Sequence, residues 1–538
     1  MNTFKNLVSK IPKEVSHVTD TLEKSGFEAY LVGGCVRDLL MDKEPKDWDV
    51  ATNAKPEQII GLFEKTVYEN TFGTVGVVVS RETVPSNVSH GTLEPRTLNL
   101  EPNFIIEVTP YRIETKYSDF RHPDEVKFSD KLEDDLKRRD FTINAMAFRK
   151  IKDNLILTDM FGGLKDIKDK TLKAVGNPND RFQEDALRML RAVRLACQLN
   201  FSVSYETTES ILKNSDLLEK ISEERIRDEL IKIIMSPSPA SGIVMLQKFA
   251  LLKNIIPELE EGIGCEQLGE HIYDIWNHSL HALSHAADKN WSLEIRLAAL
   301  FHDIGKPRAR RDAEQTQKNS AALPASGLRH GQNFSVSARP SKKKYTFYGH
   351  EVISGVMAKK IMERLKFSKK EIELVEKLVR NHMFFSDTEL ITLSAVRRII
   401  AKVGVENIWL LMNVRECDRV GMKKKEAPYR LRKYFAMIEE ALRDPISVGQ
   451  LKINGEFMIK ELGIAPGPRM GWILHALLEE ILDAPEKNMV KHLSELAKSL
   501  NMLGDAELKT LGERGKEKKE ELEEKEIEKL HTKHGVRK

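Results

Sequence analysis

The stretch LVGGCVRDLLMDKEPKDWD, residues 31–49, joins an apolar segment, a glycine pair, a short amphipathic segment and two aspartates. We predict a buried strand ending in AYLVGG (29–34) and a helix that begins at once with CVRDLLM (35–41). Glycines at Gly33 and Gly34 allow the backbone to approach a ligand closely, and the free N–H groups of a helix N-terminus favour phosphate. Arg37, in the first turn of this helix, can then hold a triphosphate.

The DWD sequence supplies a pair of carboxylates. On a strand, alternation puts Asp47 and Asp49 on the same face, where they repel each other unless a cation lies between them. Mg²⁺ prefers carboxylates together with substrate phosphates. Two such ions can activate an attacking hydroxyl and stabilise a leaving pyrophosphate. Glu107 in FIIEVTPYR is a candidate third carboxylate from a neighbouring strand, although DWD alone also fits a polar strand end.

Composition bounds the class of protein. The 538 residues predict about three or four domains, and 41% hydrophobic and 31% charged residues are typical of a soluble, helix-rich protein. A net charge of +3 restricts any nucleic-acid surface to a local patch. The four cysteines form no CxxC pair, which argues against a disulfide framework or a zinc ribbon. With no apolar run of membrane or signal length, we expect a cytoplasmic protein without a membrane partner.

The organisation changes along the chain. Alternating strand-like and helical segments fill roughly residues 1–175, and helical periodicity follows almost without a break. The polar segment at about 307–345 is typical of a flexible insertion, and the charged run at 506–538 of a solvated helix or tail. We therefore predict an α+β chain, with a small mixed β-sheet in an N-terminal domain and an all-α remainder.

The sequence resembles the class II tRNA nucleotidyltransferases (CCA-adding enzymes) and the bacterial poly(A) polymerases. LVGGCVRDLL with DWD resembles their nucleotidyltransferase signature. The remaining motifs follow in order, as LEDDLKRRDFTINAMAF (132–148), DMFGGLKDIKDKTLKAVGNP (159–178), RFQEDALRMLRAVRLACQL (181–199) and ISEERIRDEL (221–230). The resemblance covers about residues 25–260.

The resemblance implies a role for each matching position. Asp47 and Asp49 would hold Mg²⁺, and Asp185 with Arg188 would read the Watson–Crick edge of the incoming base. The implied nucleotide-binding residues are Gly33, Gly34, Arg37, Arg139, Asp185, Arg188, Arg191 and Arg194.

The spacing in the fourth motif supports this role. Asp185, Arg188, Arg191 and Arg194 repeat every three residues, which predicts a stripe along one side of a helix. An acceptor next to a donor fork can pair with the edges of both C and A if the two re-aim. The alternative for Asp185 and Arg188 is an ordinary helical salt bridge.

A loop bears on the choice of product. YRIETKYSDFRHPDEVKF (111–128) resembles the flexible loop with which CCA-adding members switch from CTP to ATP, and Arg121 is its candidate nucleotide-binding residue. The implied function is the addition of CCA to tRNA 3′ ends from CTP and ATP, with tRNA as the partner. A poly(A) polymerase or an A-adding enzyme is the alternative within the same chemistry.

A second set of residues resembles the HD phosphohydrolase superfamily. His302 and Asp303 lie in LAALFHDIGKP, with His278 upstream and Asp418 downstream. This nitrogen and oxygen ligand set suits Mn²⁺, Mg²⁺, Ni²⁺ or Fe²⁺ better than structural zinc. The positions that would bind a second metal or a phosphate are His350 and His382, while His281 and His285 fit structural roles.

An alternative of another class follows from this second set. The chain would then be an HD phosphohydrolase whose inactive transferase head only binds tRNA. The intact DWD argues against it.

The resemblances together predict the domain limits. The segment 461–485 resembles the family's C-terminal RNA-binding part, and Arg430, Arg432 and Lys433 could contact tRNA phosphates. The predicted domains are a catalytic head (1–175), a helical neck that binds nucleotide and RNA (176–262), an HD-type domain with the insertion (263–425), a helical RNA-binding segment (426–505) and the charged tail (506–538).

Overall fold

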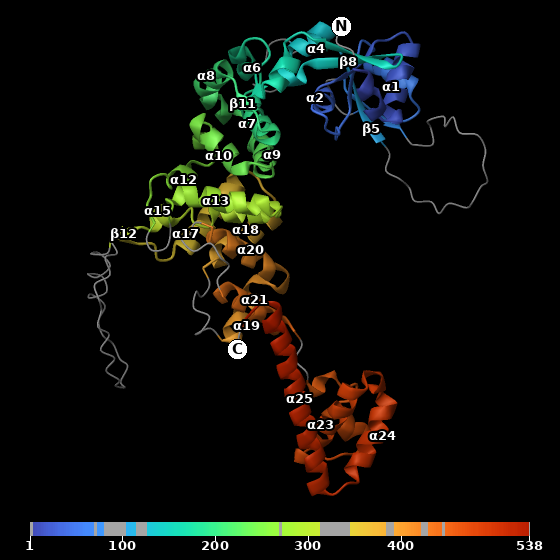
Figure 1. Cartoon of the computed structure of the whole chain (residues 1–538), viewed down its shortest axis with the longest axis vertical. Coiled ribbons are helices and arrows are strands. Elements are labelled where there is room, and N and C mark those ends of the chain that lie inside the picture. The colour runs from blue at the N-terminus through green and yellow to red at the C-terminus, as the bar shows by residue number, and fades with distance from the viewer. Residues whose placement is uncertain are drawn as a thin grey trace, which may run out of the picture. The chain divides into compact units, whose positions relative to one another are not determined.

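The structure, a computed structural model, describes residues 4–68, 73–79, 104–114, 126–267, 272–312, 345–383, 392–420, 429–443 and 447–536 (Figure 1). Arg121 and most of the predicted insertion at 307–345 lie outside these residues. The chain divides into two compact units, Met1–Arg380 with Cys417–Lys423, and Asn381–Glu416 with Lys424–Lys538. The domain limits predicted from the sequence stay predictions. No helix in the described ranges has both the length and the apolar composition needed to cross a lipid bilayer.

The head contains short helices and strands in alternation. Its elements are η1 (Lys5–Lys10), α1 (Lys13–Lys24), β1 (Ala29–Val32), α2 (Gly34–Leu40), β2 (Asp49–Thr52), α3 (Pro56–Leu62), β3 (Thr66–Tyr68), β4 (Val75–Val79), β5 (Phe104–Pro110), β6 (Arg112–Glu114), β7 (Val126–Phe128), α4 (Leu132–Lys137), η3 (Thr142–Asn144), β8 (Met146–Ile151), β9 (Asn154–Asp159), α5 (Gly163–Lys168) and β10 (Thr171–Leu172).

Seven of these strands form one mixed sheet in the order β3-β4-β5-β2-β1-β8-β9. β2 and β5 run parallel, and the other neighbours in this sheet run antiparallel. Side chains alternate between the two faces, so Leu31 and Val50 join the core beneath α1 and α3, while Val32 and Ala51 pack with α4. The predicted mixed sheet and the predicted strand before the glycine pair are confirmed.

The neck is helical and continues directly from the head. Its elements are α6 (Pro178–Glu184), α7 (Leu187–Leu199), β11 (Ser202–Val203), α8 (Tyr205–Asn214), η4 (Ser215–Lys220), α9 (Glu223–Ile234), α10 (Pro239–Lys248), α11 (Leu252–Ile255) and α12 (Pro257–Glu260). α7 packs against both α9 and α10. These contacts bring residues of the fourth and fifth sequence motifs together.

The helices after residue 272 begin with α13 (Ile275–Asp288), α14 (Leu293–Phe301), α15 (Lys306–Ala309), the paired strands β12 (Arg311–Asp312) and β13 (Tyr345–Thr346), α17 (His350–Arg364) and α18 (Lys369–Asn381). α14 packs against α13, α17 and the neck helix α9. The buried guanidinium of Arg296 on α14 donates to the carbonyl oxygens of Ile234 (3.0 Å) and Ser236 (3.2 Å) at the end of α9. This contact satisfies backbone acceptors that the helix end leaves free.

The second unit is also helical. Its elements are α19 (Leu393–Val403), η5 (Val405–Asn407), α20 (Ile408–Asp418), α21 (Tyr429–Leu442), η6 (Val448–Gln450), α22 (Gly455–Leu462), α23 (Pro468–Asp483), η7 (Pro485–Lys487), α24 (Val490–Asn501) and α25 (Asp505–Lys533). The last residues of α20 belong to the first unit.

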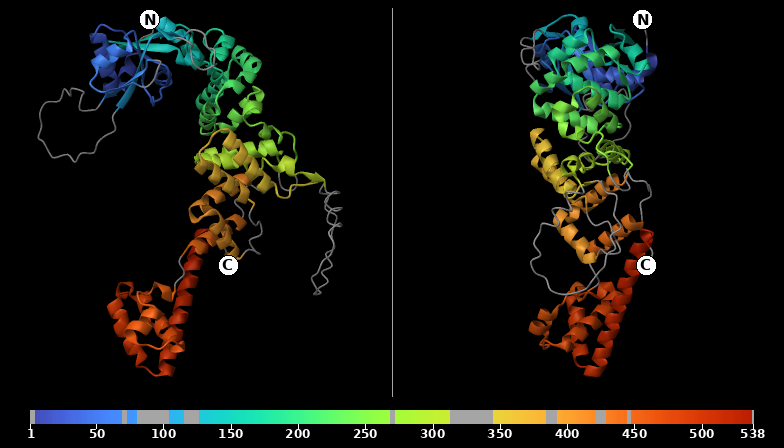
Figure 2. Two further views of the ribbon diagram at one scale, coloured as in Figure 1. Left: turned by 180° about the vertical axis from the view of Figure 1, so that it is seen from behind. Right: turned by 90° about the vertical axis from the view of Figure 1, so that its left-hand side faces the viewer.

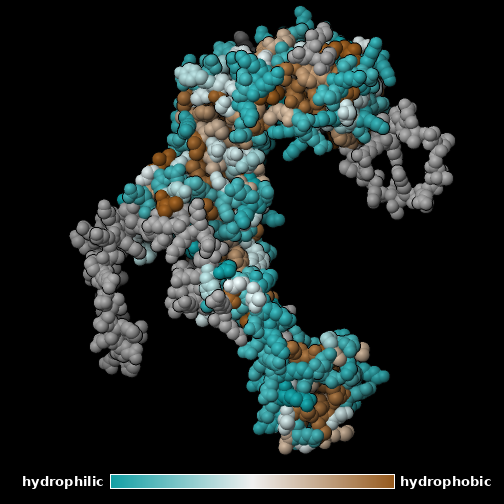
Figure 3. Space-filling view, in the orientation of Figure 1, coloured by the Kyte–Doolittle hydropathy of each residue, from teal (hydrophilic) through white to brown (hydrophobic). Residues whose placement is uncertain are grey.

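The charged C-terminal run is a helix with one packed side. α25 lies along α23, as both views of Figure 2 show, and Gly512 and Gly515 are buried there against Trp472 and His475. The predicted helix is confirmed, but it is not solvated all round, because glycines three residues apart let the two backbones approach. Figure 3 shows apolar side chains gathered on one face of the bundle that α22 to α25 form.

Gly515 gives a test of this packing. A Cβ atom there would lie 2.2 Å from the carbonyl oxygen of His475, so Gly515→Val must separate α25 from α23. We expect it to lower the free energy of unfolding by about 2 kcal/mol or more, measured by denaturant unfolding. Gly471→Ala is the matched control, because this helical glycine has open space at its Cβ and should be neutral or stabilising. Equal stability of the two variants would contradict the packing.

Candidate functional site

The glycine turn after β1 lies under two opposite charges. Gly33 has φ of 77°, a conformation that side chains rarely adopt. A Cβ atom there would lie 3.0 Å from Nη1 of Arg139 and 3.1 Å from Oδ2 of Asp49. The turn therefore needs glycine for its backbone and for the space that Arg139 and Asp49 occupy.

The sheet determines where the carboxylates point. Asp49 pairs with Val32 on β1 and with Glu107 on β5. Ala51, two residues after Asp49, packs on the α4 face, so Asp49 points to that face as well. On β5 the neighbours of Glu107 point into the opposite core, so Glu107 also lies on the α4 face. The neighbouring strands thus present Asp49 and Glu107 side by side.

Asp47 differs from the prediction. β2 begins at Asp49, and Asp47 lies exposed before the strand. The rule that both aspartates share a strand face is therefore wrong here. In the described part of the chain, the ligand oxygens of Asp47, Asp49 and Glu107 do not all lie within 4.8 Å of one another. Their shared metal role stays a prediction.

Asp49 is the more buried aspartate. Burial raises its pKa, the nearby Asp47 adds to that rise, and Arg139 opposes it. A divalent cation next to Asp49 would offset the same burial cost, as Arg139 does in part. The chemistry of the donors thus fits a hard cation such as Mg²⁺.

A buried carboxylate on α4 fixes the side chain of Arg139. Asp135 on α4 is fully buried and accepts N–H donors from Arg139 (2.9 Å) and Arg138 (2.6 Å). Burial would raise the pKa of Asp135, but the two guanidinium groups outweigh it and the pKa lies below its usual range. The arginine next to Gly33 is therefore oriented before any ligand binds.

Arg191, one of the arginines on α7, forms an ion pair with a second buried carboxylate. Arg191 donates from Nε (2.8 Å) and Nη2 (2.5 Å) to Oδ2 of Asp140, which follows Arg139 in the chain. Burial works to raise the pKa of Asp140, yet Arg191, with help from Arg188, holds it well below the usual range. This ion pair joins the head to the neck helix.

Asp185 and Arg188 do not pair with each other. α6 ends at Glu184 and α7 begins at Leu187, so Asp185 lies between two helices and is not on the stripe. Asp185 accepts from Arg225 on α9 (2.8 Å), while Arg188 pairs with Glu184 (2.5 Å). The alternative of an Asp185–Arg188 salt bridge is therefore wrong, and the base-reading role of the two residues stays a prediction.

Arg188, Arg191 and Arg194 remain a row on α7, as predicted. Arg194 pairs with the buried Glu229 of α9 (3.0 Å), and burial lowers its pKa. Arg225 and Glu229 were not predicted as site residues, although both lie in the ISEERIRDEL motif. Their spacing of four residues was the available signal for one shared helix face.

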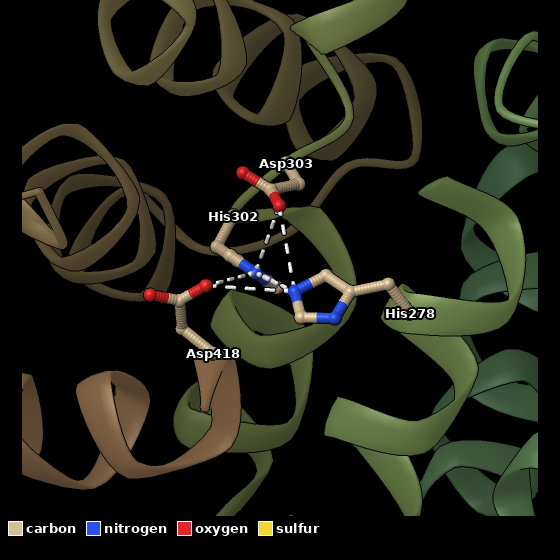
Figure 4. A group of neighbouring side chains, drawn as sticks. All are labelled: His278, His302, Asp303 and Asp418. Carbon is tan, nitrogen blue, oxygen red and sulfur yellow. Dashed lines mark hydrogen bonds and ion pairs between the residues drawn. The ribbon is translucent and has the colours of Figure 1, made fainter. Parts of the chain in front are cut away.

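A second centre lies among α13, α14 and α20. Nε2 of His278 and Nε2 of His302 are 3.0 Å apart. Oδ2 of Asp303 lies 3.3 Å from His302, and Oδ1 of Asp418 lies 3.5 Å from each histidine (Figure 4). All four ligand atoms fall within 4.8 Å of one another, and all four residues are buried. Such a convergence of two imidazoles and two carboxylates fits one divalent ion.

The surroundings of this group orient its ligands. Nδ1 of His302 lies 2.8 Å from the carbonyl oxygen of Ala299, which leaves Nε2 for a metal. Lys306 contacts both Asp303 (2.5 Å) and Gln267 (2.6 Å). Burial lowers the pKa of His302, but Asp303 and Asp418 outweigh it and raise the pKa to about 10. The negative charge of these carboxylates would stabilise a bound divalent cation in the same way as it stabilises a protonated His302.

The remaining histidines fall outside this group of four. His350 lies 3.2 Å from Oδ1 of Asp303 by its Nε2 atom. His382 belongs to the second unit, and its place in a site stays a prediction. His281 stacks on Tyr273, with ring centroids 4.2 Å apart, and His285 contacts Trp291 edge-on. Both contacts agree with the predicted structural roles.

Three parts of the chain match known families. Residues 29–173 match the family described as "Poly A polymerase head domain". Residues 200–263 match the family described as "Probable RNA and SrmB- binding site of polymerase A", and residues 275–420 match the HD domain family. The resemblance of the sequence to nucleotidyltransferases with an HD-type domain is confirmed.

Curated relatives carry the name CCA-adding enzyme. That of Ligilactobacillus salivarius is 41% identical over 266 residues, which are 46% of this chain and 60% of the relative. That of Levilactobacillus brevis is 42% identical over 229 residues, 43% of this chain and 52% of the relative. The chain therefore covers only between half and three fifths of their length. A crystal structure of Bacillus stearothermophilus CCA-adding enzyme with CTP aligns over 91% of this chain and 98% of its own, with TM-score 0.54 and 23% identity, which shows the shared fold.

The four-residue group predicts metal-dependent stability. Mn²⁺ at roughly a hundred times its dissociation constant should stabilise the folded chain by about 2.7 kcal/mol, seen as a rise in melting temperature. His302→Ala should remove the part of that rise that this group supplies, because it removes a converging ligand. His281→Ala, in the same helical region but outside the group, should keep it. If none of Mn²⁺, Ni²⁺, Fe²⁺ and Mg²⁺ changes the melting temperature of the wild-type chain, the assignment of this group as a metal site is contradicted.

Proposed function

We propose that this chain is a template-independent tRNA nucleotidyltransferase that adds C, C and A to tRNA 3′ ends from CTP and ATP. The observation that carries the proposal is the meeting of Asp49 and Arg139 over Gly33, next to the arginine row of α7. A turn without side chains, a carboxylate and several fixed guanidinium groups suit a nucleoside triphosphate. The match to a polymerase head and the relatives named CCA-adding enzyme support the reaction and the substrates.

The proposed roles follow from these positions. Arg37 and Arg139 bind and orient the triphosphate, with the glycine turn close to it. Asp47 and Asp49 would hold Mg²⁺, which when bound makes the RNA 3′-hydroxyl more acidic and neutralises the departing pyrophosphate. Glu107 lies on the same sheet face as Asp49 and would complete the ligand set. The buried carboxylates beneath the arginines keep these groups in place as charge moves between the oxygens.

Base selection is proposed for Asp185 and Arg188, together with Arg191 and Arg194 of α7. Asp185 presents an acceptor and Arg188 a donor fork. Arg188 also donates to the carbonyl oxygens of Arg181 (3.2 Å) and Arg138 (3.1 Å), so its head is fixed from two elements. Arg191 and Arg194 line the same side of α7. Arg121, outside the described residues, would act from the flexible loop.

The carboxylates give the first test of this function. Asp49→Asn keeps the volume of the side chain but removes the charge that binds the cation, so nucleotide addition should fall by roughly a thousandfold or more. Asp47→Asn should act in the same direction. The measurement is incorporation of labelled CTP into a tRNA that ends at its discriminator base. His302→Ala should leave this rate unchanged, since it removes a ligand of the other centre. Full activity of Asp49→Asn would contradict the assignment.

The product distinguishes the proposal from its alternatives. Three RNAs are compared with Mg²⁺ and CTP, ATP or both, and their ends are resolved at single-nucleotide length. They are a tRNA ending at the discriminator base, a tRNA ending in CC and an unstructured RNA. We expect CCA on the first and a single A on the second. A single A on the second alone would indicate an A-adding enzyme, and long A-tracts on the third a poly(A) polymerase.

A second function is supported by the group of His278, His302, Asp303 and Asp418. We propose that this centre is a metal-dependent phosphohydrolase acting on phosphate-terminated RNA ends, with Mn²⁺, Mg²⁺, Ni²⁺ or Fe²⁺ as the ion. Two imidazoles and two carboxylates are the donors that such ions accept. The match of residues 275–420 to the HD domain family supports it.

The two centres should separate by mutation. Asp303→Asn should abolish phosphate release from a 3′-phosphorylated RNA end and hydrolysis of a 2′,3′-cyclic end to a phosphomonoester, because it removes a buried ligand, and it should spare CTP incorporation. Asp49→Asn should do the reverse. Phosphate release is measured with each metal added to protein first stripped by a chelator. Loss of both activities in either single variant would contradict two separate centres.

A further inference from the structure

Asn144 lies between two arginines of the proposed nucleotide site, Arg37 in the head and Arg191 in the neck, and connects them through hydrogen bonds. It ends η3, and its side chain is buried, with 8% of the residue exposed. Oδ1 of Asn144 accepts from Nη1 of Arg37 at 2.9 Å. Nδ2 donates to Oδ1 of Asp140 at 3.2 Å. Asp140 in turn holds Arg191 of α7 through its other oxygen.

The chemistry of the partners fixes the orientation of this amide. Turned the other way, Nδ2 would face the donor groups of Arg37 and Oδ1 would face the carboxylate of Asp140. Both contacts would then be repulsive, and only 8% of Asn144 is exposed to water that could relieve them. The residue must therefore accept on one side and donate on the other, which neither an acid nor an apolar side chain can do.

Arg37 keeps free donors despite its partners. Nε and Nη2 contact Asp38 (2.8 and 2.7 Å), and Nη1 contacts Asn144. A guanidinium group has five N–H donors, so one on each terminal nitrogen remains for a ligand. Asp38 and Asn144 contact different edges of the Arg37 guanidinium group. Together the two contacts fix the plane of that group.

We propose that Asn144 is a positioning residue for nucleoside triphosphate binding. It fixes Arg37, the proposed triphosphate contact of the head, and joins it through Asp140 to Arg191 in the base pocket of the neck. The triphosphate end and the base end of the site are thus parts of one hydrogen-bond network. This inference rests on the proposed nucleotide site and adds a residue to it.

The test is a double-mutant cycle on the full chain, read as CTP and ATP binding by calorimetry without RNA. Arg37→Ala should weaken binding roughly tenfold to a hundredfold, the usual effect of losing hydrogen bonds to a charged group. Asn144→Ala alone should weaken it about tenfold. In the Asn144→Ala background, the further effect of Arg37→Ala should shrink to about threefold or less, because the two residues act together.

Thr142→Val is the matched control. Thr142 is buried in the same short helix and donates to Asp166 (2.6 Å), with no contact to Arg37. We expect it to lower the melting temperature but to leave affinity within about twofold. Asn144→Leu is the second variant, since it keeps roughly the volume of the side chain but offers Arg37 no acceptor. In this background the further effect of Arg37→Ala should also shrink to about threefold or less, and this arm decides the case should Asn144→Ala fail to fold.

The outcomes separate this inference from the proposed function. Equal effects of Arg37→Ala in all backgrounds, or loss of affinity in Thr142→Val equal to that in Asn144→Ala, overturn the positioning role. Nucleotide binding without any extension of tRNA by the wild-type chain overturns the proposed function and leaves the cycle to decide the role of Asn144. No binding of CTP or ATP by the wild-type chain overturns both.

Discussion

The head site depends on two buried carboxylates that cannot remain unpaired. Asp135 and Asp140 lie beneath the proposed nucleotide site, and each is held ionised by arginines. Removing one partner of a buried ion pair typically costs about 3–5 kcal/mol, because the remaining charge stays desolvated. The arginines therefore have little freedom to leave. Their outward N–H groups stand in place before a ligand arrives, and binding an anion there costs little further ordering.

The glycine turn makes this arrangement usable. Arg139 and Asp49 approach the backbone of Gly33 closely, and a methyl group at that position would meet both side chains. The positive charge of Arg139 suits a polyphosphate, and the negative charge of Asp49 suits a divalent cation. The two ligands can therefore bind side by side at this turn. The same turn ends β1, β2 begins opposite it at Asp49, and Asp47 lies outside the sheet.

Local patterns predicted what is local. The alternation around the glycine pair predicted the strand and the mixed sheet. The converging ligands come from distant parts of the chain and followed from the resemblance to the HD phosphohydrolase superfamily. What failed depended on partners distant in the chain. The break between α6 and α7 removes Asp185 from the helix, and its partner Arg225 lies 40 residues away on α9. The packing of α25 was hidden because its charges dominate the pattern, and two buried glycines decide its contact.

The neck helix α9 serves both centres structurally without linking their chemistry. Its first turns hold Asp185 through Arg225 and its middle holds Arg194 through Glu229, while its end is capped by Arg296 of α14. α14 then leads directly into His302. One rigid neighbour can therefore support two sites. Their donors differ, since Asp49 offers only carboxylate oxygens, whereas the second centre adds two imidazoles that transition metals favour. Loss of a ligand in one group leaves the donors of the other complete.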